Sequence, residues 1–154
     1  MSRTFTIEEA NALVPLLAST FLRTGQLLGA ARAAARRLAA AGVRSERPGE
    51  LPSAEAVGVD PDLAAELARA RMLLDTAADD ARSLEKLGLL VRDIERGLVD
   101  FRTVMDGERE VFLCWKIGER DVRYWHDAHA GVVGRQPTEG HRFFRARQLR
   151  PPPE

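Results

Sequence analysis

The features that this 154-residue chain lacks set the first limits on what it can be. Its single cysteine, Cys114, cannot form an internal disulfide, and no signal-peptide pattern opens the sequence, so we expect a cytoplasmic protein. The longest apolar run, from Leu87 to Val91, is interrupted by Gly88 and is too short to span a bilayer. We therefore expect no membrane partner.

An excess of charge of either sign is also missing. The chain has 23 basic and 23 acidic side chains and a pI near 6.9, so it creates no global field for nucleic acid or anionic lipid. Lysine is scarce, occurring only at Lys86 and Lys116, and we attribute the arginine bias to genomic base composition because it extends over the whole chain. The length and the 45% apolar content indicate a single domain, residues 1–154.

The N-terminal segment "FTIEEANALVPLL" predicts a helical arm over residues 7–41. Thr6 and Glu9 have the spacing of a capping box, in which each side chain accepts a hydrogen bond from the other residue's backbone N–H. Pro15 has no N–H to donate inside this arm, so we expect a kink near Leu13. A heptad-like seam follows the kink: Leu17, Phe21, Thr24, Leu28, Ala31, Ala35 and Leu38.

A segment rich in Gly, Pro and Ser predicts a flexible loop over residues 42–60, and Asp60 and Pro61 then mark the start of a second helical arm, residues 61–88. Its seam is Leu63, Leu67, Ala70, Leu74, Ala77, Ala81, Leu84 and Gly88. Two seams of this kind predict an antiparallel hairpin with coiled-coil packing. Because two long seams can exceed what one partner helix covers, we also predict a homodimer through the helices.

The charges of the two arms favour their pairing. Residues 23–47 contain six arginines and one acid, Glu46, whereas residues 55–96 contain ten acids and six bases. The first arm is thus interpreted as a solvated basic face beside an acidic neighbour. Nucleic-acid binding through Arg32, Arg36, Arg37 and the tail arginines is the less favoured alternative, since no aromatic residues interleave with them.

After Gly88 the pattern changes to alternation of apolar and polar residues, which predicts strands. We expect a small β-meander with a glycine loop over residues 89–137, followed by a tail over residues 138–154. The Asp106-Gly107 pair is typical of a tight hairpin turn. The three expected strands are 98–104, 109–117 and 121–125. The predicted fold class is α+β, with a long antiparallel helical hairpin packed beside a three-stranded antiparallel meander.

The segment "YWHDAHAGVVGRQP" holds the residue types from which a metal site could be built. A site made from His126, Asp127, Glu119 and His129 would support a metal-dependent hydrolase, with the ion as its cofactor. No HExxH or paired CxxC motif is present, so this remains an alternative, and otherwise we expect no cofactor. Cys114 lies between apolar neighbours and is interpreted as a buried, unreactive thiol.

The same segment also suggests a site for a small anion. Gly131 and Gly134 could turn backbone N–H groups toward an anion, and Arg135 could form a two-pronged contact with a carboxylate or phosphate. The competing interpretation is structural: the glycines turn the chain, and Arg135 pairs with an acid such as Asp93 or Glu95.

"FTIEEANALVPLL" and "VRDIERGLVDFRTVMDGEREVFLCWKIGERDVRYWHDAHAGVVGRQP" together resemble the bacterial family called domain of unknown function 2203. His129 lies outside the family pattern, which undercuts a two-histidine metal site, and Arg102 stands where the family usually has proline. The resemblance implies no agreed activity. The family pattern falls on Asp93, Gly97, Leu98, Asp100, Phe101, Gly107, Leu113, Cys114, Trp115, Gly118, Glu119, Trp125, His126, Gly131, Gly134 and Arg135.

The residue pattern and the family resemblance both point to one group of polar residues as the candidate site. Asp93 and Asp100 flank the first expected strand, Glu119 lies in a turn, and His126 and Arg135 follow the third. Such a group forms either a ligand site or an internal network of hydrogen bonds. We expect a non-enzymatic interaction module that self-associates through its helices, with a small-anion site formed by His126, Arg135, Glu119, Asp100, Gly131 and Gly134.

Overall fold

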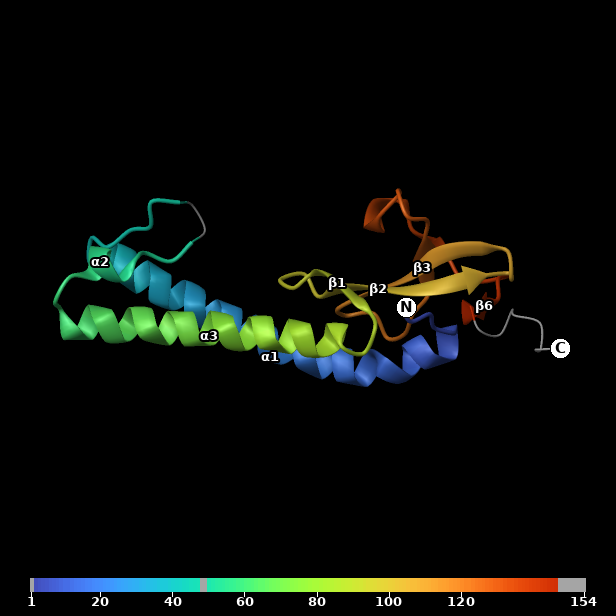
Figure 1. Cartoon of the computed structure of the whole chain (residues 1–154), viewed down its shortest axis with the longest axis horizontal. Helices are drawn as coiled ribbons and strands as arrows, with labels where there is room; N and C mark the ends of the chain where they lie inside the picture. Colours follow the sequence, from blue (N-terminus) through green and yellow to red (C-terminus); the bar gives the residue numbers. More distant parts are fainter. Residues whose placement is uncertain (1, 48–49, 147–154) are drawn as a thin grey trace. The chain divides into compact units, whose positions relative to one another are not determined.

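A computed structural model describes residues 2–47 and 50–146 and confirms the α+β class (Figure 1). It contains two long helices, α1 (Ile7–Ala40) and α3 (Pro61–Glu85), and a short helix α2 (Ala54–Val57). The chain forms two compact units: unit 1 comprises Met1–Phe21 with Ala81–Glu154, and unit 2 comprises Leu22–Asp80. Among the described residues, no helix has both the length and the apolar character needed to cross a membrane.

Unit 2 is an antiparallel pair formed by the later part of α1 and most of α3. The start of α3 is capped as predicted, since the Asp60 carboxylate accepts the N–H of Asp62 at 2.9 Å. Arg23 pairs with Asp80, which confirms the attraction between a basic and an acidic arm. The predicted seams are buried at Ala31, Leu38, Leu67, Ala70 and Ala77, whereas the seam residue Ala35 is half-buried and its neighbour Ala34 is buried instead.

Unit 1 places the first turns of α1 against the sheet. The capping box is present: the Thr6 N–H donates to Glu9 Oε1 at 3.0 Å, and the Glu9 N–H donates to Thr6 Oγ1 at 3.1 Å. α1 continues as one helix through Pro15, and the kink near Leu13 stays a prediction. The core of this unit joins the helix to the sheet through residues that include Phe5, Leu17, Phe21, Val99, Phe101, Leu113 and Trp115.

Within residues 2–47 and 50–146 the sheet has six antiparallel strands rather than the three predicted. The additional strands have two to four residues, too few for an alternating pattern to be visible in the sequence. Their order is β1-β2-β3-β4-β5, with β6 paired to β2. The strands are β1 (Leu90–Asp93), β2 (Leu98–Met105), β3 (Arg109–Lys116), β4 (Tyr124–His126), β5 (Gln136–Pro137) and β6 (Phe143–Phe144).

Segments predicted to be irregular contain two of the short elements. The loop 42–60 includes α2, which is capped by a hydrogen bond from the Ala56 N–H to Ser53 Oγ. The tail 138–154 includes β6, and its residues 147–154 lie outside the described part of the chain. The second arm ends earlier than residue 88, because Gly88 has φ +99°, a conformation that ends a helix.

Candidate functional site

The register of the sheet separates an apolar face from a polar one. Phe101 is opposite Leu113 across β2 and β3, and both side chains belong to the core that also contains α1. Because side chains alternate along a strand, Asp100 and its partner Cys114 lie on the other face. His126 on β4 is on that same face, since it pairs with the residue two before Cys114.

Three neighbouring strands thus bring together Asp100, Cys114 and His126, which we call the sheet cluster. All three are almost fully buried, with relative exposures of 2%, 0% and 4% respectively. One donor atom from each residue, namely a carboxylate oxygen, the sulfur and a ring nitrogen, lies within 4.8 Å of the other two. The sheet cluster is therefore a compact polar group shielded from water.

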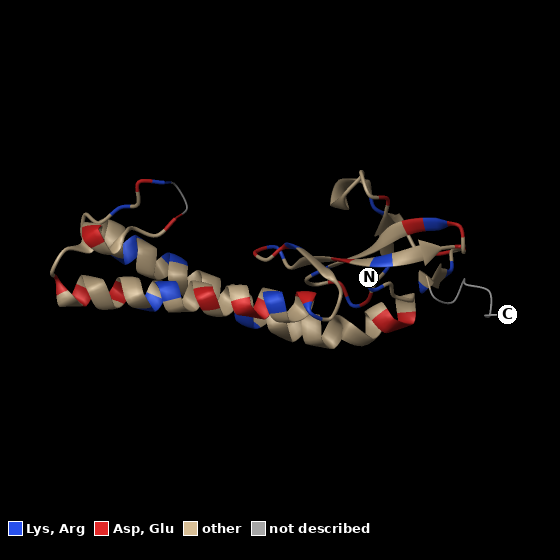
Figure 2. Ribbon diagram, in the orientation of Figure 1, with Lys and Arg blue, Asp and Glu red and all other residues tan. Residues whose placement is uncertain are grey.

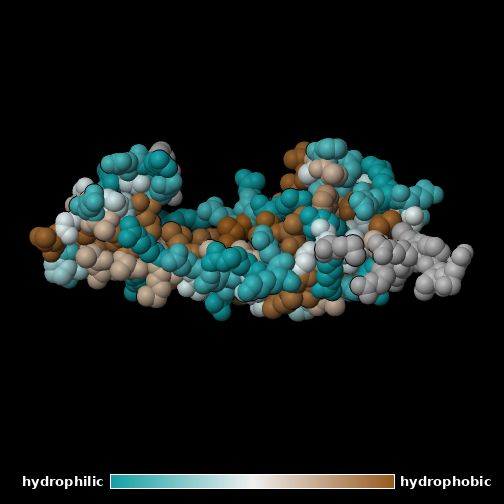
Figure 3. Space-filling view, viewed as in Figure 1, coloured by the Kyte–Doolittle hydropathy of each residue, from teal (hydrophilic) through white to brown (hydrophobic). Residues whose placement is uncertain are grey.

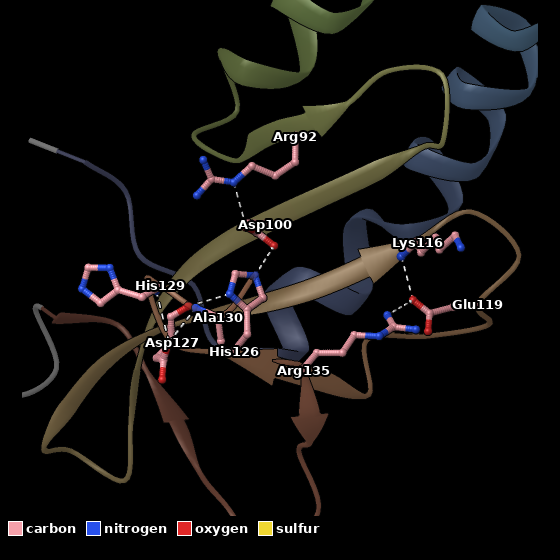
Figure 4. A network of polar contacts seen from close by, with 9 residues as sticks. All are labelled: Arg92, Asp100, Lys116, Glu119, His126, Asp127, His129, Ala130 and Arg135. Atoms are coloured by element: carbon pink, nitrogen blue, oxygen red, sulfur yellow. Dashed lines mark hydrogen bonds and ion pairs between the residues drawn. The ribbon is translucent and has the colours of Figure 1, made fainter. Parts of the chain in front are cut away.

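Hydrogen bonds fix two members of the sheet cluster (Figure 4). Asp100 Oδ2 accepts from Arg92 Nε at 2.8 Å, and Asp100 Oδ1 lies 2.9 Å from His126 Nε2. The other ring nitrogen, Nδ1, lies 2.7 Å from the backbone carbonyl oxygen of Asp127. A carbonyl oxygen only accepts, so Nδ1 carries a proton, and both ring nitrogens face oxygen atoms. Phe112 stacks on the imidazole with 5.5 Å between ring centroids.

A second network lies beside the sheet cluster and contains the predicted Arg135 and Glu119. Arg135 Nη1 donates to Glu119 Oε1 at 2.9 Å, and the same oxygen accepts the Lys116 N–H at 2.7 Å. The Arg135 guanidinium lies over the Tyr124 ring, 4.1 Å from its centroid. Asp93, expected as an alternative partner of Arg135, instead forms an ion pair with Arg96.

The structure confirms that Cys114 is a buried free thiol. Burial raises the pKa of Cys114 to about 12, with a further upward contribution from the negative charge of Asp100 and an opposing hydrogen bond from Arg135. A thiol with this pKa stays protonated at neutral pH and is a poor nucleophile. Nucleophilic catalysis by Cys114 is therefore not supported.

The residues proposed for the metal-dependent hydrolase are not brought to one point. The Asp127 carboxylate accepts the backbone N–H groups of His129 and Ala130 and pairs with Arg109. These two backbone hydrogen bonds, Ala130 first, lower the pKa of Asp127. The exposed His129 ring points away from His126 (Figure 4). Of the expected set, only His126 belongs to the metal-competent group found among the described residues, Asp100, Cys114 and His126.

The glycine loop is shaped by its own hydrogen bonds. Gly131 has φ +59°, which favours glycine, and the short helix η1 (Val132–Gly134) follows it. The Gly134 N–H donates to the Gly131 carbonyl, and the Arg135 N–H to the Val132 carbonyl. A Cβ at Gly134 would lie 2.6 Å from the Cβ of Ala130. An anion at this loop would thus have to displace contacts that the chain already makes.

Sequence reasoning overlooked two contributions to this face. Arg92 lies in a short strand that the pattern did not reveal, and Cys114, a possible further metal ligand in the sequence, is interpreted there as a packing residue. The signal for Cys114 was the hairpin itself: with its turn after Met105, alternation places Asp100 opposite Cys114.

Comparison with known proteins adds a family and no activity. A family model described as "Uncharacterized conserved protein (DUF2203)" matches residues 3–138. No curated protein and no solved structure matches the chain.

Proposed function

This chain belongs to the family of uncharacterized conserved proteins DUF2203, whose description states no activity. We propose that the protein is a non-enzymatic interaction module that self-associates through unit 2. In this proposal the paired helices of two copies form a four-helix arrangement. The charged groups Asp100 and Glu119 of the sheet are already held by Arg92 and Arg135, which favours the helices over the sheet as the interaction surface.

The observation that carries the proposal is the exposure of large apolar side chains on the helical pair. Leu22 on α1 is 62% exposed, and Met72 and Leu74 on α3 are 66% and 37% exposed. Leu74 is a member of the α3 seam, so part of the surface patterned for helix packing remains uncovered. Figure 3 shows apolar groups reaching the surface between polar ones along the helices. In this proposal, contact with a second copy covers exposed apolar side chains of this kind.

The core inside unit 2 is small, so association with a second helical pair would bury additional apolar area. Ala31, Ala34, Ala70 and Ala77 are among the buried residues of this core, and an alanine buries little apolar area. Larger side chains gather at one end, in a cluster of Leu38, Val43, Val57 and Leu67. Helices of this length need tertiary packing for most of their stability. Contact with a second pair would add the apolar burial that the alanines do not provide.

The charge distribution is compatible with contact between copies. Acidic residues recur along α3 (Figure 2), whereas the later part of α1 is basic. Within one chain Arg37 already pairs with Glu66, and Arg23 with Asp80. Arginines matched in this way by acids favour a protein partner over nucleic acid. A second copy related by a two-fold axis presents the same complementary charges.

Sedimentation velocity of the full chain from about 1 to about 100 µM tests the proposal, because self-association follows mass action. We expect a dimer for the wild type and a monomer for the double variant Leu22→Glu/Leu74→Glu. Val133→Glu is the matched control: Val133 is 96% exposed but lies in η1, so this variant should dimerise normally. A wild type that sediments as a monomer over the whole range would refute the proposal.

A further inference from the structure

We propose that Asp100, Cys114 and His126 form a binding site for a transition-metal ion of the zinc class. The proposal concerns the sheet of unit 1 and does not depend on self-association of unit 2. Neither the family description nor the expected set of His126, Asp127, Glu119 and His129 assigns this group of ligands.

The geometry is close to that of a three-ligand metal site. The donor atoms of the sheet cluster lie within 4.8 Å of one another, whereas the ligand atoms of a tetrahedral zinc ion lie roughly 3.3 to 3.8 Å apart. Asp100 Oδ1 and His126 Nε2 are 2.9 Å apart and would have to separate slightly, and side-chain rotations of about 1 Å bring the three donors to the distances of a zinc site. Because the three residues come from β2, β3 and β4, their backbone positions are fixed by strand pairing.

The contact between His126 and Asp100 requires a positively charged bridge. The Nδ1 proton is donated to the Asp127 carbonyl, which leaves the lone pair of a neutral imidazole on Nε2, directed at Asp100 Oδ1 2.9 Å away. The carboxylate, held by Arg92, also presents lone pairs. Either a proton or a metal ion between these atoms removes the conflict. Histidine ligands to metals typically donate their other N–H to a carbonyl or carboxylate, as His126 does.

Cys114 favours a metal ion over a proton. A proton shared by His126 and Asp100 makes no use of a third donor, yet the Cys114 sulfur is within 4.8 Å of both. A ligand set of sulfur, nitrogen and one carboxylate oxygen suits zinc and related ions, and it excludes magnesium and calcium, which prefer oxygen alone.

The surrounding groups leave the ligand atoms available while orienting them. Arg92 binds Asp100 through Oδ2, so Oδ1 remains for a metal ion. Arg135 contacts the Cys114 sulfur, and its charge is balanced by Glu119. Two nearby guanidinium groups reduce the affinity for a dication, so we expect weaker binding than at a closed four-cysteine site. The burial of the ligands favours a structural ion that joins three strands over a catalytic one.

Titration of the chelator-treated full chain with Co²⁺ tests the site. Cys114 is the only cysteine of the chain, so a thiolate-to-cobalt charge-transfer band reports this sulfur alone. We expect the band to appear at one equivalent, to disappear when Zn²⁺ displaces Co²⁺, and to be absent in Cys114→Ser. Zinc affinity should fall by more than about tenfold in Cys114→Ser and in Asp100→Asn.

His129→Ala is the matched control, because it removes a neighbouring exposed histidine and should leave both the band and the affinity unchanged. Should Cys114→Ser fail to fold, X-ray absorption of the zinc-loaded wild type must still show one sulfur neighbour. No binding by the wild type, or binding without a sulfur signal, overturns the proposal.

Discussion

At the scale of single residues, the charged side chains on the polar face of the sheet are paired with oppositely charged partners. Asp100 is 2% exposed, and the Arg92 guanidinium compensates the charge of its carboxylate although water is excluded. Glu119 and Arg135 form the neighbouring pair. The sequence predicts that these residues gather around the sheet. It does not predict which of them pair, because the partners are far apart in the chain and chemically interchangeable.

The burial of Cys114 predicts how the free energy of unfolding depends on pH. The pKa of Cys114 in the folded state is about 12, above the ordinary value of 9.0. Between these two pH values the thiol is protonated in the folded state but ionised in the unfolded state. The unfolded state therefore binds fewer protons between these values, and stability falls as the pH rises through this window, by at most about 1.4 kcal/mol per pH unit. Urea unfolding of the chelator-treated chain at a series of pH values measures the slope.

The matched variant for this measurement is Cys114→Ala. The smaller side chain lowers stability at every pH, but it removes the ionising group, so the alkaline slope should become shallower than that of the wild type. Equal slopes for both proteins would show that Cys114 is accessible to solvent and ionises alike in both states.

At the scale of elements, the hairpin turn determines what the sheet brings together. Asp106 and Gly107 have φ values of +56° and +76°, and the pairing that follows matches Met105 with Arg109. A one-residue slip of this register would move Asp100 to the apolar face. The turn and the two long strands are predictable because their signals are local. The short β4, expected at 121–125 but observed at Tyr124–His126, has no such signal, and it is the element that positions His126.

Gly97, in the turn between β1 and β2, shows how tightly this region is packed. It has φ +63°, and a Cβ there would lie 2.8 Å from the Cβ of Ile117. Gly97→Ala therefore adds a steric clash to an unfavourable backbone conformation, and we expect it to lower the free energy of unfolding by more than about 2 kcal/mol. Gly118→Ala is the control, since Gly118 has φ +97° but open space around it.

Chemical denaturation of both glycine variants separates the two contributions. Gly118→Ala should lose only the conformational part, about 1 to 2 kcal/mol. Equal losses would mean that the backbone at Gly97 shifts away from Ile117 at no cost.

At the scale of the whole molecule, the two units differ in how much of their packing follows from local sequence patterns. The two long helices of unit 2 have seams that repeat every three to four residues, and this local pattern predicts their pairing. Unit 1 joins Met1–Phe21 to Ala81–Glu154, so its core forms only when distant segments meet. The pairing of β6 with β2 is an example, because Phe144 and Val104 carry no sequence signal that links them.

This division predicts that self-association should change the dynamics of one unit alone. If the helices of unit 2 meet a second copy, their amide hydrogens should exchange more slowly at high protein concentration, whereas those of β2 and β3 should exchange at unchanged rates. Hydrogen-exchange mass spectrometry at two concentrations measures both in one sample. Leu22→Glu/Leu74→Glu should abolish the difference. Slowing of both units alike would instead indicate that the sheet takes part in the contact, because the protection of an amide reports the local stability of its own segment.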